Sequence, residues 1–248
     1  MTNLIKYLKE LQNWLFDYVK KSKAKGVIFG LSGGIDSAVV AAIAKETFGF
    51  ENHLALIMHI NNSKLDFQAT SELVKKMQFN SINIELEESF NLLVKTLGID
   101  PKKDFLTAGN IKARLRMITL YAYAQKHNFL VLGTGNFVEY TLGYFTKWGD
   151  GACDIAPLAW LLKEDVYKLA KHFNIPEIVI TRAPTASLFE GQTDETEMGI
   201  TYKELDQYLK GDLILSSEKQ KIVLDLKAKA EHKHNSPLKF KHLYNFQN

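Results

Sequence analysis

A glycine- and serine-rich stretch near the N-terminus has the residue types needed to hold phosphate groups. Residues 29–37 read Phe-Gly-Leu-Ser-Gly-Gly-Ile-Asp-Ser and lie between an apolar run and a helical pattern. Adjacent glycines let the backbone turn tightly and point consecutive N–H groups at one anion, and the following helix adds its positive end. Ser32 and Ser37 supply hydroxyl donors. Because both the Walker A ending and the G-x-G-x-x-G pattern are missing, we expect a phosphate site of another kind.

An acidic residue, Asp36, falls inside this loop. A carboxylate beside phosphates is repulsive unless a cation lies between them, and Mg²⁺ accepts oxygen ligands from both. The sequence therefore predicts a phosphate site with Mg²⁺. The alternative is that Asp36 or Ser37 only caps the following helix, although capping alone does not require Ser-Gly-Gly ahead of it.

Apolar runs that alternate with helical patterns predict the scaffold that positions the loop. Strands are expected at 25–30, 53–58, 81–85 and 129–132, and helices at 4–21, 37–48, 66–77, 90–97, 110–127 and 163–173. Such strands are typical of a parallel sheet covered on both faces, and right-handed crossovers make it a doubly wound, Rossmann-like α/β fold. Residues 181–198 lack apolar periodicity and are expected to form a long loop that closes over the site.

Composition and charge restrict the class of protein. The 248 residues are 46% hydrophobic and 24% charged, which is typical of a globular chain. A net charge of +3 gives little support for nucleic-acid binding. We expect no transmembrane helix, because no apolar run approaches about 18 residues, and no secretory signal. The single cysteine, Cys153, excludes a disulfide framework, and a reducing cytoplasm fits best.

Several motifs in this order resemble one enzyme family. Residues 32–37 resemble the SGGxDS loop of N-type ATP pyrophosphatases, which cleave ATP to AMP and pyrophosphate while adenylating a substrate. Three further blocks resemble the NAD synthetases of that superfamily: NIKARLRM at 110–117, GTGNFVE and GYFTKWGD within 133–150, and PTASL with DETEMGI within 184–200. The resemblance covers most of the chain and implies an adenine nucleotide alpha hydrolase-like fold. Gly135-Asn136 departs from the family pattern, where an Asp-containing stretch is usual.

The resemblance also implies which residues bind ligands. ATP is implied to contact the loop and three later residues, namely Gly30, Leu31, Ser32, Gly33, Gly34, Ile35, Asp36, Ser37, Thr134, Lys163 and Thr185. Deamido-NAD is implied to contact Arg114, Lys147, Asp154, His232 and Lys233. Asp36 and Glu139 are the implied Mg²⁺ ligands, and no residue is assigned as a general acid or base. Arg116 lies two residues from Arg114, so the two cannot share one helix face, and Arg116 is expected to be structural.

The implied activity is that of an ammonia-dependent NAD synthetase, a ligase that forms a carbon–nitrogen bond in the last step of NAD biosynthesis. The carboxylate of deamido-NAD attacks the α-phosphorus of ATP, and ammonia then converts the acyl-adenylate into the amide, giving NAD, AMP and pyrophosphate. Glutamine-dependent relatives carry an additional amidase domain, and only about 25 residues precede the first strand here. We therefore expect one domain over residues 1–248, no glutaminase domain, and free ammonia as the donor. The family also implies a homodimer.

Other interpretations of the same residues remain open at this point. A tRNA-modifying ATP pyrophosphatase that moves sulfur usually needs paired cysteines, and this chain has one. A non-catalytic nucleotide sensor would not need Asp36, Glu139 and Lys163 together. A nucleic-acid module with a basic tail lacks interleaved aromatic residues outside 240–246. On sequence alone Lys163 could equally be a solvent-facing helix residue, and the less favoured alternative for Glu139 is a surface glutamate.

Overall fold

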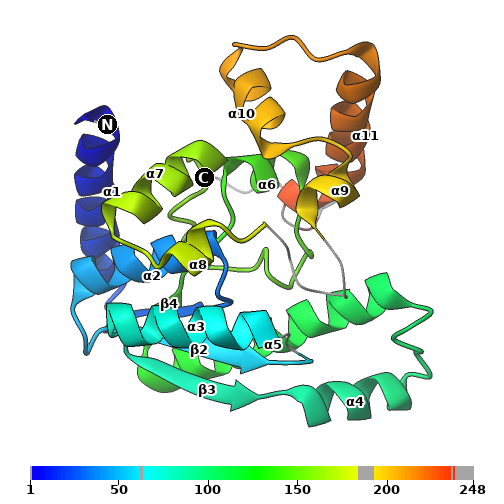
Figure 1. Cartoon of the computed structure of the whole chain (residues 1–248). Coiled ribbons are helices and arrows are strands. Elements are labelled where there is room, and N and C mark those ends of the chain that lie inside the picture. The colour runs from blue at the N-terminus through cyan, green and yellow to red at the C-terminus, as the bar shows by residue number, and fades with distance from the viewer. Residues whose placement is uncertain (1, 62–63, 184–192, 236, 238–248) are drawn as a thin grey trace, which may run out of the picture.

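A parallel four-stranded sheet forms the centre of the fold (Figure 1). The computed structural model describes residues 2–61, 64–183, 193–235 and 237. The strands are β1 (Gly26–Gly30), β2 (His53–His59), β3 (Ser81–Glu85) and β4 (Phe129–Val131), in the order β3-β2-β1-β4. All four predicted strands are confirmed. Strands β2 and β3 are added on one side of β1 and β4 on the other, so the winding order reverses between β1 and β4, where open α/β sheets bind ligands outside the carboxyl ends of the strands.

Helices cover both faces of this sheet, as predicted for a doubly wound fold. One face packs against α1 (Thr2–Lys21), α2 (Ile35–Phe48), α3 (Lys64–Met77), α7 (Lys163–His172) and α8 (Glu177–Ile180). The other packs against α5 (Phe105–His127), with α4 (Glu87–Thr96) beside α5. The alternation within β1 divides its side chains accordingly, because Val27 and Phe29 face α2 whereas Ile28 faces α5.

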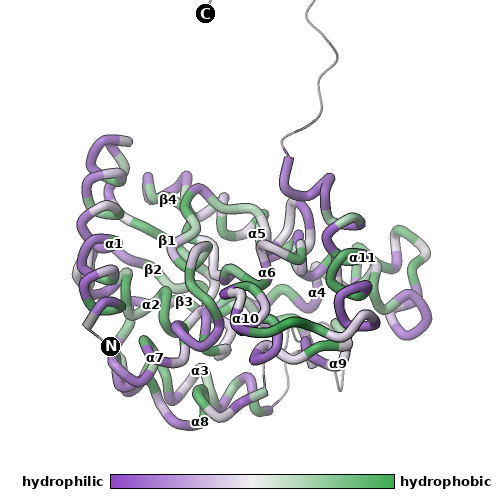
Figure 2. Tube along the Cα trace, turned by 90° about the horizontal axis from the view of Figure 1, so that it is seen from above, coloured by the Kyte–Doolittle hydropathy of each residue, from purple (hydrophilic) through white to green (hydrophobic). Residues whose placement is uncertain are grey.

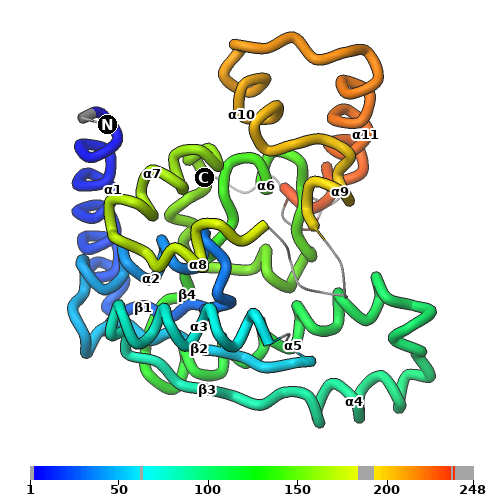
Figure 3. Tube along the Cα trace, in the orientation of Figure 1, coloured from blue at the N-terminus to red at the C-terminus, as the bar shows by residue number. Residues whose placement is uncertain are grey.

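Helix α6 (Phe137–Leu142) and three helices from the C-terminal part of the chain form a second apolar cluster (Figure 3). The three are α9 (Asp194–Met198), α10 (Tyr202–Lys210) and α11 (Ser217–His234). Helix α10 packs on α6 and α7, and α11 packs on α6. This cluster therefore meets the sheet domain at the start of α7. No helix among the described residues is long and apolar enough to cross a membrane.

The structure corrects several predicted boundaries. The helix expected from residue 110 begins at Phe105, and the one expected from 90 begins at Glu87. The expected loop at 181–198 is wrong at its end, because Asp194–Met198 is the helix α9, which Thr193 caps and Gly199 ends in the left-handed region. So short a helix has no apolar period to detect. Residues 184–192, most of the predicted closing loop, lie outside the described residues.

Helix α1 buries one face, which its alternating hydropathy shows along the trace in Figure 2. The sequence pattern predicts that Leu8, Leu11, Leu15 and Tyr18 form an apolar face that is buried against the sheet or a second subunit. The three leucines lie in the core beside α2. Tyr18 does not, because it is 44% exposed and Val19 takes the buried position instead. The N-terminal helix is thus part of the main core.

Replacing Leu15 with alanine should test this packing. Leu15 is fully buried, and the lost contacts and remaining cavity should lower the free energy of unfolding by about 2–5 kcal/mol in a urea titration. Leu224→Ala, at an exposed position of α11, is the matched control and should change stability by less than about 0.5 kcal/mol. Equal effects from the two variants would contradict the placement of α1 in the core.

Candidate active site

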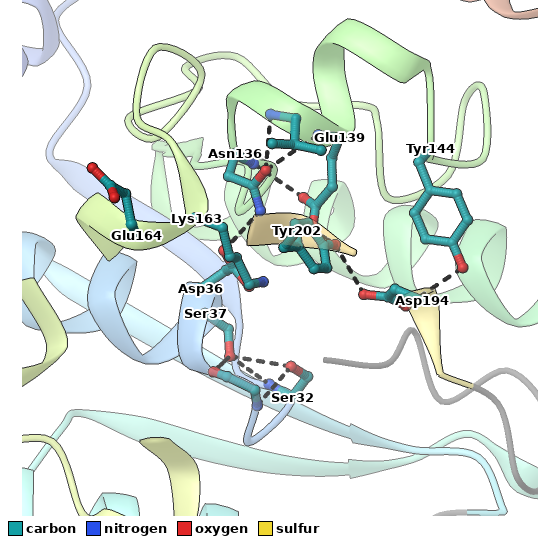
Figure 4. Close-up of polar contacts among 12 residues, drawn as sticks. Ser32, Asp36, Ser37, Asn136, Glu139, Tyr144, Lys163, Glu164, Asp194 and Tyr202 are labelled. Atoms are coloured by element: carbon teal, nitrogen blue, oxygen red, sulfur yellow. Dashed lines mark hydrogen bonds and ion pairs between the residues drawn. The ribbon is translucent and has the colours of Figure 1, made fainter. Parts of the chain in front are cut away.

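The phosphate loop between β1 and α2 is held in shape by its own serines (Figure 4). The Ser37 hydroxyl donates to the Gly34 carbonyl at 2.9 Å and accepts from the Ser32 N–H at 3.2 Å. The Ser32 hydroxyl lies 3.1 Å from that of Ser37 and accepts from the Gly34 N–H. Gly33 has φ +81°, a left-handed conformation that favours glycine. Because the N-cap, Gly34, has no side chain, the positive end of α2 is left for an anion.

Asp36 does not cap α2, so the capping alternative is wrong for this residue. Its Oδ1 accepts from the side-chain amide of Asn136 at 3.0 Å, and its Oδ2 pairs with Nζ of Lys163 at 2.6 Å. The carboxylate therefore joins the loop to two elements more than 90 residues away in sequence. This position beside the loop is the one expected of a metal ligand that also meets phosphate.

Asn136 connects the two predicted metal ligands. It is fully buried and caps α6, since its Oδ1 accepts from the N–H groups of Val138 and Glu139 at 3.0 and 3.1 Å. In return, Oε2 of Glu139 accepts from the Asn136 N–H at 3.0 Å, which completes a capping box. One asparagine thus fixes Asp36 by its amide and Glu139 through the helix start. Asn136 is not among the site residues predicted from the sequence, although Asn followed three residues later by Glu is a recognisable cap pattern.

Lys163 is the first residue of α7 and is only 2% exposed, so the surface alternative is wrong. Its Nζ lies 4.6 Å from the centre of the Tyr202 ring. Asp206 of α10 caps the helix in place of a local residue, accepting from the N–H groups of Lys163 and Glu164 at 3.2 and 2.8 Å. Burial lowers the pKa of Lys163, but the Asp36 and Glu139 carboxylates outweigh it and raise the pKa overall.

Tyr202 and Asp194 extend the site toward the C-terminal cluster, and the sequence analysis gave neither a role. The Tyr202 hydroxyl lies 3.2 Å from Oε1 of Glu139 and 3.1 Å from Oδ2 of Asp194. Oδ1 of Asp194 accepts from the Tyr144 hydroxyl at 3.4 Å. The region around Asp36 and Glu139 is therefore linked by hydrogen bonds to the segment 143–150.

The residues present fit a Mg²⁺ ion held jointly by protein and phosphates. Burial and the neighbouring Asp36 carboxylate raise the pKa of Glu139 to about 8, against the opposing effect of Lys163. Such a shift marks a pair of carboxylates that calls for more positive charge. Among the described residues no group of three or more His, Cys, Asp or Glu could hold a metal ion alone. Two carboxylates beside a phosphate loop match the way Mg²⁺ binds, through one or two carboxylates and substrate oxygens.

Four of the five residues expected to contact deamido-NAD lie together. Arg114 donates to the Lys147 carbonyl at 3.2 Å, and Nζ of Lys147 donates to the His232 carbonyl. Nζ of Lys233 donates to the carbonyls of Gly143 and Phe145 at 2.7 and 2.6 Å. The site thus gathers three basic side chains from α5, α11 and the 143–150 segment.

The fifth residue, Asp154, is held at the end of β4. Its Oδ2 accepts from the Val131 N–H at 2.8 Å and its Oδ1 from the Tyr121 hydroxyl at 3.3 Å. Thr134 lines a cavity of about 40 Å³ together with Glu139, Tyr140, Asp150 and neighbouring residues.

Three of the residues predicted to bind ATP cannot be assigned a side-chain contact with it. Leu31 and Ile35 are buried in the main core, so only their backbone can face a ligand. Thr185 lies outside the described residues.

Arg116 lies as expected of a structural residue, and Cys153 is a partly buried free cysteine. Arg116 points away from Arg114 and donates to the Met58 carbonyl at 3.4 Å. Cys153 packs against Tyr140, with its sulfur 3.6 Å from that hydroxyl. Burial raises the pKa of the Cys153 thiol, which disfavours the nucleophilic thiolate.

Comparison with known proteins places the chain in a family. The family model described as NAD synthase matches residues 7–239. An NH(3)-dependent NAD(+) synthetase of Mycoplasma pneumoniae is 61% identical over 245 residues, covering 99% of this chain and 98% of the relative. Among solved structures, the NMN synthetase from Francisella tularensis has a TM-score of 0.89 at 38% identity, covering 96% of this chain and 99% of that one. The NH3-dependent NAD synthetase from Campylobacter jejuni, in complex with the nitrate ion, has a TM-score of 0.79 at 29% identity over the same shares.

Replacing Asn136 with aspartate should show that Asn136 stabilises the Asp36 and Glu139 carboxylates. The change removes the amide donor to Asp36 and places a third carboxylate beside the first two. We expect the metal-free variant to lose about 1–3 kcal/mol of unfolding free energy, and added Mg²⁺ to restore part of it. Both are measurable by urea titration.

Asn136→Ser is the matched control, because serine keeps a capping oxygen for α6 and adds no charge. It should cost less than Asn136→Asp and should not gain as much from Mg²⁺. If the two variants are equally stable and respond equally to Mg²⁺, Asn136 is only a helix cap.

Proposed function

The chain belongs to the NAD synthase family, and on that premise we propose that it amidates deamido-NAD with ammonia at the expense of ATP, giving NAD, AMP and pyrophosphate. It is then a carbon–nitrogen ligase of NAD biosynthesis with small-molecule substrates. The observation that carries the proposal is the convergence of Asp36, Glu139 and Lys163 on the Ser-Gly-Gly loop. A loop for phosphates beside two carboxylates and a buried cation is what nucleotide activation of a carboxylate requires.

The first step is attack of the nicotinate carboxylate on the α-phosphorus of ATP, with pyrophosphate as the leaving group. We assign the loop residues 32–37 and the start of α2 to the departing phosphates. Lys163 adds positive charge to them, since it lies buried beside the loop. Mg²⁺, held by Asp36 and Glu139, supplies further neutralisation of phosphate charge when bound. Catalysis in this step is positioning and electrostatic stabilisation, with no general base required.

The second step is attack of ammonia on the acyl-adenylate, which breaks the bond to AMP and leaves the amide. Ammonia must come close to the activated carbonyl while bulk water is kept away. The cavity of about 40 Å³ beside Thr134 and Glu139 has room for a molecule of this size. Free ammonia as donor is further supported by the Mycoplasma pneumoniae relative, which is named as NH(3)-dependent and matches the chain almost end to end.

We assign the acceptor dinucleotide to the basic group formed by Arg114, Lys147 and Lys233, with His232 and Asp154. Three cations suit the diphosphate of a dinucleotide. Helices α4 and α5 also expose Leu92, Phe105, Leu106 and Ile118, an apolar surface that suits the homodimer predicted from the family. The cytoplasmic location remains a prediction.

A second acceptor is worth testing because the Francisella tularensis neighbour is an NMN synthetase. An enzyme that makes NMN by amidation would take the mononucleotide acid in place of deamido-NAD. Measuring kcat/KM for both acceptors with the same enzyme decides between them. We expect deamido-NAD to be preferred, since the Mycoplasma pneumoniae relative has the higher identity.

The decisive assay is the product profile with ATP, Mg²⁺, deamido-NAD and ammonium, separated by chromatography. NAD, AMP and pyrophosphate should form in equal amounts, and glutamine should replace ammonium poorly. ATP left intact, or cleaved without dependence on the acceptor, would contradict the assignment.

Replacing Asp36 with alanine should abolish the first step. Loss of a metal ligand and of the Lys163 partner is expected to reduce pyrophosphate release by about a hundredfold or more. Asp17→Ala, which removes an exposed carboxylate from α1, is the control and should keep full activity.

A further inference from the structure

A lysine lies where positive charge is needed at the two carboxylates. Nζ of Lys163 is 2.6 Å from Oδ2 of Asp36, and its side chain is 3% exposed. We propose that Lys163 is a built-in counter-cation, which holds the acidic pair in the empty enzyme and must release Asp36 when Mg²⁺ is loaded with ATP. The inference rests on the proposed function only in that Mg²⁺ arrives together with a nucleotide.

The hydrogen bonds around the pair single out Lys163 as the contact that can be released. All four carboxylate oxygens of Asp36 and Glu139 are engaged, two by Asn136, one by Tyr202 and one by Lys163. The Asn136 contacts belong to the cap of α6 and to a fully buried side chain. Tyr202 is also buried and held by Asp194. Only the Lys163 contact ends on a long flexible side chain.

Charge makes the two cations alternatives for the same oxygen. An ammonium group and a divalent ion repel each other strongly at contact distance in a site sheltered from water. Among the described residues Lys163 is the one basic side chain paired with Asp36. Removing the Lys163 ammonium leaves the two neighbouring carboxylates without its positive charge, which is costly in a buried site. A metal ion that binds without nucleotide must therefore displace the Lys163 ammonium from Asp36, and the ammonium gains no new anionic partner in exchange.

A nucleotide changes this balance because its phosphates accept the displaced ammonium. The main chain of Lys163 need not move, since Asp206 fixes the first turn of α7. Only the side chain swings from Asp36 toward the phosphates in the adjacent loop. Lys163 thus makes Mg²⁺ binding depend on nucleotide binding, and it disfavours Mg²⁺ binding without nucleotide.

The test measures metal binding without nucleotide or acceptor, so it is independent of the activity assay. Mn²⁺ replaces Mg²⁺ because it takes oxygen ligands and its free form is counted by electron paramagnetic resonance. We expect Lys163→Met, which keeps the length and removes the charge, to bind Mn²⁺ about tenfold more tightly than wild type. Lys163→Arg should stay as weak as wild type.

The matched control is Lys168→Met, which removes a partly exposed lysine from the same helix. Lys168 pairs with Glu164 and Asp165, away from the acidic pair, so Mn²⁺ binding should be unchanged. Equal or weaker Mn²⁺ binding by Lys163→Met would overturn the proposal. A failure of the wild-type enzyme to form NAD, alongside tighter Mn²⁺ binding by Lys163→Met, would instead count against the proposed function.

A measurement on the wild-type protein covers the case in which Lys163→Met does not fold. In protein labelled with ¹³C at lysine Cε, the Lys163 resonance is identified by its loss in Lys163→Arg. It should move when ATP and Mg²⁺ are added together and stay in place with the same concentration of Mg²⁺ alone. A resonance that does not respond to the two together overturns the proposal.

Discussion

The buried ion pair between Asp36 and Lys163 is the interaction around which the site is built. Its partners are 127 residues apart in sequence and come from the first turn of α2 and from the start of α7. A carboxylate and an ammonium removed from water need good geometry and further hydrogen bonds to offset their desolvation. Asn136 supplies one of these to the carboxylate, and the Tyr202 ring lies against the ammonium. The packing of α6, α7 and α10 therefore also brings these charged and polar groups into contact.

The C-terminal helices are for this reason part of the site rather than an appendage to the sheet. Helix α10 contributes Tyr202 at its first turn and Asp206 one turn later. The first contacts Glu139, and the second caps α7. Helix α9 adds Asp194, which ties Tyr202 to Tyr144. These side-chain contacts therefore connect the predicted nucleotide and acceptor regions through one hydrogen-bond network.

The sequence predicts those parts of the molecule that depend on local pattern. Apolar runs give the four strands, and Ser-Gly-Gly with Asp36 gives the phosphate loop. It could not predict that Asp206 caps a helix 43 residues earlier, or that Tyr202 joins Glu139 to Asp194, because such partners meet only through tertiary packing. Asn136 is intermediate, since its cap pattern is local whereas its bond to Asp36 spans 100 residues. The family resemblance assigned the ligands but not the residues that hold them in place.

The capping of α7 by Asp206 has a consequence for how fast the Lys163 side chain can exchange partners. Because the backbone at Lys163 is fixed from another helix, the exchange of partners is confined to the torsions of one side chain. Such rotamer changes take picoseconds to nanoseconds in exposed residues, whereas hinge motions of domains take microseconds to milliseconds. The exchange of partners by Lys163 therefore requires no hinge motion of the fold.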